Sequence, residues 1–370
     1  MSANIRPAGT FDTNYEQDLK INRTPLSRIM ANGLFLALLA VPLLTSEGPL
    51  GLSIIPSAWI GTIVRIAIYS IAVIGLNILM GYTGQISLGQ AAFMGVGAYS
   101  AAIMAREWGM PFFLAVPLAA LFTACIGLLF GLPSLRVKGF YLAMATLAAQ
   151  FIIPWVLRYP LAPITNGSRP LTVPEPMIGN ISFAPQVSMY YLAIPLAVLL
   201  AFLARNVTRT RTGRAFISIR DNDLAAELLG INVFSYKLQA FFLSSLYAGI
   251  AGALWAFDVG SLSVDKFRLN LSIEFLAMLV LGGAGFSLGP LFGVSFLLIL
   301  NENVIPSIVS SLKVTLPQLL PFISAANVEA ALVPMLFGFA LIIFLILEPR
   351  GLAYRWEILK IAWKIRPYSY

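Results

Sequence analysis

The sequence predicts an all-α, polytopic membrane protein with about ten transmembrane helices, some of them interrupted by glycine-rich or re-entrant segments. The chain contains ten long apolar runs, and Lys and Arg gather in alternate gaps between them. Of its 370 residues 59% are hydrophobic and only 11% are charged, which leaves too little polar surface to cover a soluble globule. Helices and closed barrels are the only backbones that satisfy their own polar groups in lipid, and these runs are too long and continuous for barrel strands.

The order of the runs predicts the topology. Spans are expected at residues 29–46, 60–80, 86–105, 112–131, 139–158, 188–204, 238–257, 272–282, 289–305 and 328–347. With the N-terminus inside, 17 of the 24 Lys and Arg residues fall in inside gaps and six in outside gaps, while Arg65 lies near an outer helix end. The positive-inside rule therefore predicts that both termini are cytoplasmic.

This topology divides the chain into a cytoplasmic tail at residues 1–28, a transmembrane region at 29–347 and a second cytoplasmic tail at 348–370. The region contains a cytoplasmic loop at 205–237 and periplasmic loops at 159–187 and 306–327. The periplasmic loops are long enough to cap a pore or receive a soluble partner, and a plain connecting role is equally open.

Composition excludes several kinds of chemistry. The chain has no histidine, which rules out histidine metal sites, histidine-activated nucleophiles and histidine proton relays. It has no Gly-Lys dipeptide and hence no P-loop, so no ATP hydrolysis, no enzyme activity and no bound cofactor are expected of this chain. Membrane orientation explains the net charge of +8, and no nucleic-acid partner is expected.

Two glycine-rich segments interrupt the helical pattern, one from Gly75 to Gln90 and one from Gly282 to Pro290, and both contain Ser-Leu-Gly. Non-helical backbone at membrane depth occurs only inside protein or beside a wet cavity, and paired glycine interruptions are typical of transporter pores. The polar side chains of the first segment either line a pathway or hydrogen-bond between helices. The residues predicted to line a translocation path are Asn77, Tyr82, Gly84, Gln85, Ser87, Gln90, Gly282, Gly283 and Gly285.

The gap at 205–237 holds six basic residues, more than any other internal gap, and contains signals for a short helix. Ser218 followed by Asp221 predicts a capping box, and Gly230 is suited to a left-handed stop after a helix over 221–229. A helix capped at both ends would present a rigid surface to a soluble partner. The alternative is a helix resting on lipid headgroups, and its acidic residues count against that on an anionic leaflet.

At these residues the chain resembles a known family. Ala225-Ala226-x-x-x-Gly230 resembles the EAA loop of ABC importer permeases, with Leu224 in place of the motif's leading Glu. Residues 75–99, 214–254 and 279–290 resemble the M-type permease of branched-chain amino acid importers, over roughly residues 60–350. The string Gly-Tyr-Thr-Gly-Gln-Ile-Ser-Leu-Gly-Gln at 81–90 is the most specific part. Related urea and short-amide permeases typically carry Gly-His after Ser-Leu, whereas this chain has Gly89-Gln90, which favours amino acids.

The resemblance implies a type II-like ABC importer permease in the bacterial cytoplasmic (inner) membrane. It implies a heterodimer with a second permease, two cytoplasmic ATPase subunits that hold ATP and Mg²⁺, a periplasmic binding protein, and import of branched-chain amino acids. Import of urea, short amides or other amino acids stays open, and so does a stand-alone secondary carrier, although no coupling-ion residues are found. The residues implied to couple to the ATPase are Arg220, Asp221, Asp223, Ala225, Ala226, Leu229 and Gly230.

Overall fold

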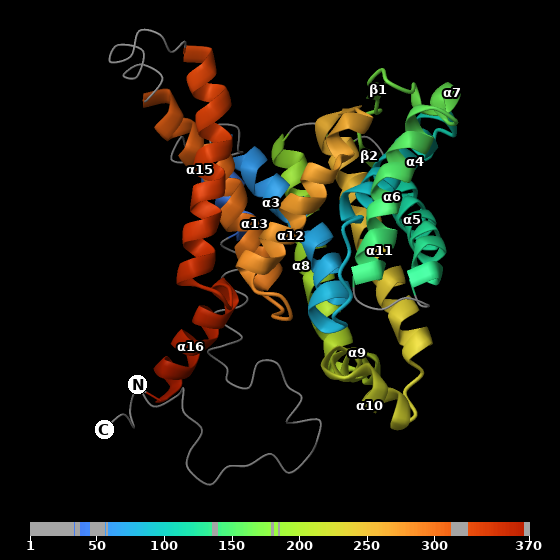
Figure 1. Ribbon diagram of the computed structural model, residues 1–370. Coiled ribbons are helices and arrows are strands. Elements are labelled where there is room, and N and C mark those ends of the chain that lie inside the picture. Colours follow the sequence, from blue (N-terminus) through green and yellow to red (C-terminus); the bar gives the residue numbers. More distant parts are fainter. Residues whose placement is uncertain are drawn as a thin grey trace. The chain divides into compact units, whose positions relative to one another are not determined.

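Apolar helices make up most of the computed structural model (Figure 1). It describes residues 33, 38–44, 56, 58–134, 140–178, 181–183, 186–311 and 325–365. One unit comprises residues 62–355, and another comprises residues 1–61 with 356–370, where a short 3₁₀ helix spans Val41–Leu44. The site described below lies within residues 62–355.

The long helices follow one another along the chain, some directly and some through longer segments such as residues 159–185 between α6 and α8. They are α3 (Ala58–Leu76), α4 (Gln90–Glu107), α5 (Phe112–Ser134), α6 (Phe140–Arg158), α8 (Gln186–Arg209), α11 (Val233–Val259), α12 (Leu269–Gly282), α13 (Gly289–Ile299) and α15 (Ala325–Leu347). Two π-helical segments continue α3 and α13, namely η2 (Asn77–Tyr82) and η4 (Leu300–Val304).

The predicted fold class is confirmed. Six helical stretches in the described ranges are long and apolar enough to cross a membrane: Trp59–Tyr82, Phe112–Leu132, Gln186–Arg209, Val233–Val259, Gly289–Ser311 and Leu332–Ile361. Two shorter apolar helices cover Leu142–Arg158 and Leu269–Gly282. The predicted span at 29–46 and the predicted loop at 306–327 lie largely outside the described residues, whereas each of the other nine spans overlaps a helix. The helix α16 (Leu352–Ile365) falls in the predicted tail at 348–370 and was not expected.

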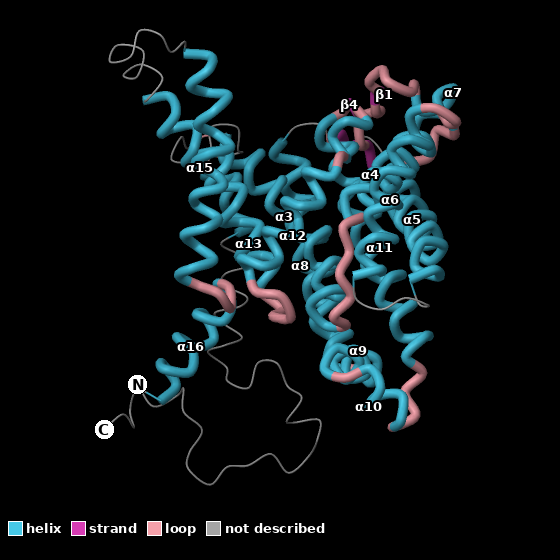
Figure 2. Tube along the Cα trace, viewed as in Figure 1, coloured by secondary structure: helices cyan, strands magenta, loops and turns pink. Residues whose placement is uncertain are grey.

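One predicted boundary is wrong for an informative reason. The span at 86–105 was expected to begin at residue 86, but residues 83–89 are non-helical and α4 begins at Gln90 (Figure 2). Gly84 has φ +69°, a left-handed conformation that ends the preceding π-helix. Thr83, Gln85 and Ser87 are buried, whereas Gly84 and Ile86 between them are exposed, so only one side of this irregular backbone faces the protein interior.

The core is built on small residues. Helices α4, α5 and α11 pack against one another, and a side chain added at Gly97 of α4 would meet the backbone of Gly249 in α11. Without a hydrophobic driving force between helices in lipid, such close backbone approach lets dispersion contacts hold the helices together.

The two ends of this unit differ (Figure 1). The α9–α10 end carries α9 (Arg211–Asp221), α10 (Asp223–Leu228) and the loops at 83–89 and 283–288. The α7 end carries α7 (Ala162–Thr165), η3 (Val264–Phe267) and two short antiparallel strand pairs, β1 (Leu171–Thr172) with β4 (Ser261–Leu262) and β2 (Met177–Ile178) with β3 (Ile181–Ser182). The α7 end thus contains the predicted periplasmic loop at 159–187.

Candidate functional site

The two glycine-rich segments lie against each other, and the amide of Asn77 joins them. Its Oδ1 accepts a hydrogen bond from the backbone N–H of Gly285 at 2.8 Å, and its Nδ2 donates to the carbonyl of Phe286 at 3.0 Å. Asn77 is only 2% exposed, so these bonds form away from water, where an unpaired amide would be costly. One side chain therefore fixes the second glycine turn against η2, the π-helix that continues α3.

Arg220, the next-to-last residue of α9, connects the same turns to the loop at 205–237. Its Nη1 donates to the carbonyl of Gly81 at 3.1 Å, and a side chain added at Gly285 would lie 3.2 Å from that Nη1. The stem of Arg220 lies beside Gly84, whose added Cβ would be 3.1 Å from the arginine Cγ. We call Asn77, Gly81, Gly84, Arg220 and Gly285 the turn cluster.

Backbone conformation explains why the cluster needs glycine. Gly285 has φ +86°, a region that residues with a Cβ rarely adopt, and the carbonyl of Gly81 lies 3.2 Å from where its Cβ would be. A side chain at this position would therefore meet both backbone strain and a close neighbour.

The remaining path residues predicted from the sequence are also buried within the chain. Gln90 Nε2 donates to the carbonyl of Ala72 at 2.7 Å, and the Ser244 hydroxyl donates to Gln90 Oε1 at 3.2 Å. Gln85 Nε2 donates to the Thr83 hydroxyl at 2.9 Å. Gln90 thus forms hydrogen bonds between helices, and Asn77 joins a helix to a loop. A path-lining role for the whole set stays a prediction. The other members are Tyr82 and Ser87, both buried, and the glycines Gly282 and Gly283, of which Gly282 packs against the backbone of Gly289.

The short helix α10 is capped at both ends, although not by the predicted residues at its start. The capping box at Ser218 and Asp221 is wrong: Ser218 lies inside α9, and Asn222 is the N-cap of α10. Asn222 Oδ1 accepts from the backbone N–H groups of Leu224 and Ala225 at 3.1 and 3.0 Å. The predicted helix over 221–229 is therefore a shorter helix over 223–228, separated from α9 by one residue.

The C-terminal stop at Gly230 is confirmed. Its φ is +83°, its N–H donates to the carbonyl of Glu227 at 2.9 Å, and the N–H of Ile231 donates to the carbonyl of Ala226 at 3.0 Å. This pair of bonds is the Schellman pattern, which satisfies two carbonyls that the helix itself cannot. Capping at both ends gives this short helix a defined shape.

The side chains of α10 divide into an inward and an outward group. Ala226 is buried, and Asp223 forms an ion pair with Lys237 at 3.5 Å. Leu224, Leu228 and Leu229 are 61%, 89% and 81% exposed, and Ala225 is exposed beside them. Asp221, just before α10, forms an ion pair with the neighbouring Arg220 at 3.1 Å. Apart from Glu227, which is also exposed, the outward surface of α10 and its C-cap Leu229 is therefore apolar.

An ion pair between two apolar helices was missed by the sequence reasoning. Arg65 Nη2 of α3 donates to Glu302 Oε2 of η4 at 2.8 Å, and the Thr62 hydroxyl donates to the same oxygen at 3.0 Å. Arg65 was assigned only to a helix end. The signal was available, because a Glu adjoining one apolar run and an Arg inside another are rare in membrane spans and usually pair.

The comparisons with known proteins agree with this arrangement of a helical membrane permease. Residues 59–346 match the family described as the permease component of branched-chain amino acid transport systems, and the chain belongs to this family. It is a multi-pass membrane protein of a transport class, not an enzyme class.

Individual relatives are moderately similar. The high-affinity branched-chain amino acid permease LivM of Salmonella typhimurium is 31% identical over 259 residues, and LivM of Escherichia coli K12 is 30% identical over 259 residues. Each alignment covers 64% of this chain and 61% of the relative, so the chain spans about three-fifths of the LivM length. The nucleoside ABC transporter permease NupC of Lactococcus lactis subsp. cremoris is 28% identical over 219 residues, covering 53% of this chain and 66% of the relative. No solved structure matches the chain.

Proposed function

We propose that this chain is a transmembrane subunit of an ATP-driven importer that carries branched-chain amino acids into the cytoplasm. Energy would come from separate ATPase subunits, since the sequence has no P-loop. A second permease and an external binding protein would complete the assembly. Membership of the permease family and the names of the LivM relatives support the transport class and the substrate.

The observation that carries the proposal is the exposed apolar surface of α10. Leu228 and Leu229 are more than four-fifths exposed on a helix capped at both ends. Exposed leucines on a rigid helix are suited to an apolar groove on a soluble protein, because burying them gains free energy without first ordering the backbone. We assign this groove to the ATPase subunit.

The turn cluster supplies a route from α10 to the membrane spans. Arg220 is three residues before Asp223, where α10 begins, and it donates to Gly81 in the π-helix that ends the first described span. A movement of α9 would therefore pull on the first glycine turn, and through Asn77 on the second. In this proposal ATP-driven movement of α10 changes how the two turns pack, which opens or closes the path between subunits.

The proposal is tested by placing a charge on the outward face of α10. Leu228→Asp should reduce recovery of the ATPase subunit with the tagged permease at least tenfold, since a carboxylate would have to be buried in the groove. The matched control is Leu161→Asp at the α7 end, where the leucine is also exposed. Equal recovery of the ATPase with Leu228→Asp and with the unsubstituted chain would contradict the docking role.

Substrate identity is tested separately by competition. Uptake of labelled leucine by cells with the complete transporter should be reduced by excess isoleucine or valine, and not by nucleosides or urea. Competition by a nucleoside alone would assign the chain to the substrate of its NupC relative.

A further inference from the structure

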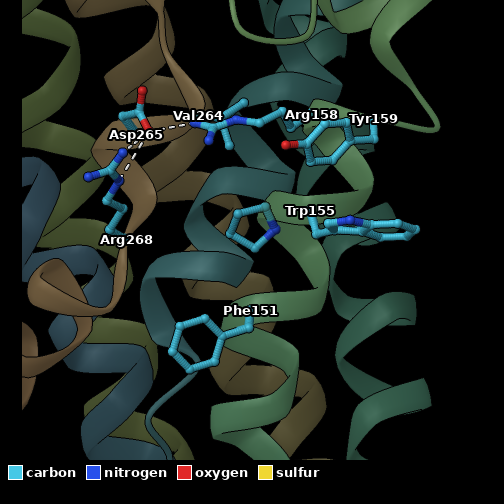
Figure 3. Close-up of a pocket in the computed structure, with 8 residues that line it drawn as sticks. Phe151, Trp155, Arg158, Tyr159, Val264, Asp265 and Arg268 are labelled. Carbon is cyan, nitrogen blue, oxygen red and sulfur yellow. Dashed lines mark hydrogen bonds and ion pairs between the residues drawn. The ribbon is translucent and has the colours of Figure 1, made fainter.

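A groove at the α7 end lies far along the chain from the turn cluster and shares no residue with it. Its volume is about 200 Å³, and it is lined by residues at the end of α6 and around η3 (Figure 3). The lining residues are Phe151, Pro154, Trp155, Arg158, Tyr159, Val264, Asp265 and Arg268.

The polar side of the groove carries more positive than negative charge. Asp265 Oδ1 accepts from Arg158 Nη2 at 2.5 Å and from Arg268 Nε at 3.0 Å, and Arg268 Nη2 donates to the same oxygen. Hydrogen bonds from Arg158 and then Arg268 hold the pKa of Asp265 below its ordinary value. Two guanidinium groups thus share one carboxylate, which leaves one uncompensated positive charge with N–H groups to donate.

The apolar side of the groove follows one face of α6 and the residue just after it. Phe151, Trp155 and Tyr159 recur every four residues, and they are 60%, 56% and 61% exposed. The Trp155 and Tyr159 rings lie 6.0 Å apart between centroids. Because α6 rises about 1.5 Å per residue, the three rings extend over about 12 Å along its axis.

The groove is apolar at one end and charged at the other, in the same order as the hydrocarbon and headgroup layers of a membrane. Phe151 lies within the apolar helix Leu142–Arg158, whereas Arg158 and Tyr159 lie where it ends. Trp and Tyr favour the interface between hydrocarbon and water, and the rings lead from the hydrocarbon to the arginines. A phospholipid has the same order, with an acyl chain joined to a phosphate.

We propose that this groove binds an anionic phospholipid, with the phosphate at Arg158 and Arg268 and the upper part of an acyl chain against Phe151 and Trp155. The excess positive charge complements a headgroup with one net negative charge, and arginine forks match phosphate oxygens. A small soluble ligand fits less well, because such ligands are usually enclosed on most sides and these rings are more than half exposed. This proposal does not depend on the proposed function.

The test uses the purified full-length chain and native mass spectrometry of its bound lipids. In an equal mixture of phosphatidylglycerol and phosphatidylcholine with the same acyl chains, the unsubstituted chain should retain phosphatidylglycerol preferentially. Arg268→Gln should lower that preference about tenfold, the size expected for losing a charge-assisted hydrogen bond. Trp155→Ala should lower retention of both lipids.

Arg169→Gln is the matched control, because Arg169 is exposed in the same end of the molecule and does not line the groove. Equal effects of Arg268→Gln and Arg169→Gln would overturn the proposal by showing a general effect of charge. Displacement of the lipid by inorganic phosphate would assign the site to a free anion, and displacement by leucine would assign it to a small zwitterion. Either displacement would overturn the lipid assignment.

Discussion

Arginine side chains make different contacts at the α9–α10 end and at the α7 end of the unit formed by residues 62–355. At the α9–α10 end, Arg220 donates to the carbonyl of Gly81 and lies against two glycine turns. At the α7 end, Arg158 and Arg268 share one carboxylate beside exposed aromatic rings. The first arrangement fixes the backbone, whereas the second leaves charge and apolar surface side by side.

This difference in arginine contacts is the basis for proposing a different kind of binding partner at each end. At the α9–α10 end Asn77 and Arg220 donate to the chain's own backbone, and the exposed side chains of Leu224, Leu228 and Leu229 form the surface that we propose for a protein partner. At the α7 end a charged and an apolar surface adjoin, which suits an amphipathic ligand. Buried polar groups thus fix the backbone at one end, whereas the exposed groups are the ones that we propose for binding.

The largest expected effect comes from filling the space at Gly285. Gly285→Ala should reduce uptake at least tenfold, because the added methyl lies 3.2 Å from both Arg220 Nη1 and the Gly81 carbonyl, and the φ of +86° is strained for alanine. Gly260→Ala is the control, since Gly260 has φ +71° but no neighbour within 4 Å. Radiolabelled uptake in cells distinguishes crowding from strain, and equal uptake by the two variants would show that crowding at Gly285 has no effect beyond the backbone strain that both positions share.

Removing the amide of Asn77 should have the next largest effect. Asn77→Leu leaves the Gly285 N–H and the Phe286 carbonyl without this partner. Each buried group left unpaired should lower the free energy of unfolding by about 1–3 kcal/mol. Thermal unfolding of the purified permease should shift downward, while the exposed control Asn270→Leu should not shift it. An unchanged unfolding temperature in Asn77→Leu would show that the amide does not hold the turns together.

A smaller effect is expected at Gly230, where space is free and only conformation matters. No atom lies within 4 Å of a Cβ built there, so Gly230→Ala should cost about 1 kcal/mol, the strain of a left-handed residue. Hydrogen exchange at the amide of Ile231 should accelerate about fivefold. Gly230→Asn should exchange more slowly than Gly230→Ala, because asparagine tolerates this conformation better.

The smallest effect concerns pH at the α7 end. Since the folded pKa of Asp265 lies below its ordinary value, its pairing with Arg158 and Arg268 stabilises the folded chain above the unfolded pKa. That contribution is lost as the pH falls through the folded pKa. The difference in unfolding temperature between the unsubstituted chain and Asp265→Asn should be constant from about pH 8 to pH 5 and narrow below about pH 4. A difference that grew on acidification would contradict the pairing.

Local sequence signals predicted where helices and turns occur better than they predicted which of them contact one another. The stop at Gly230 and the glycine interruptions followed from the conformations that only glycine adopts easily. The start of α10 was misplaced because α9, with Phe216 and Ile219 buried, continues through Ser218 to Asp221. The joining of Asn77 to Gly285 and of Arg220 to Gly81 spans 208 and 139 residues, and no local pattern specifies such pairs.

In the proposed mechanism Arg220 connects α10 to the glycine turns, and substrate-stimulated ATP hydrolysis by the reconstituted complex tests this connection. Arg220→Gln should still recover the ATPase subunit, because the leucines of α10 are unchanged, but loaded binding protein should no longer stimulate hydrolysis. Arg220→Lys should restore part of the stimulation, since an ammonium can still donate to the Gly81 carbonyl. Normal stimulation in Arg220→Gln, with the ATPase still bound, would show that the bond from Arg220 to Gly81 does not couple α10 to the membrane spans.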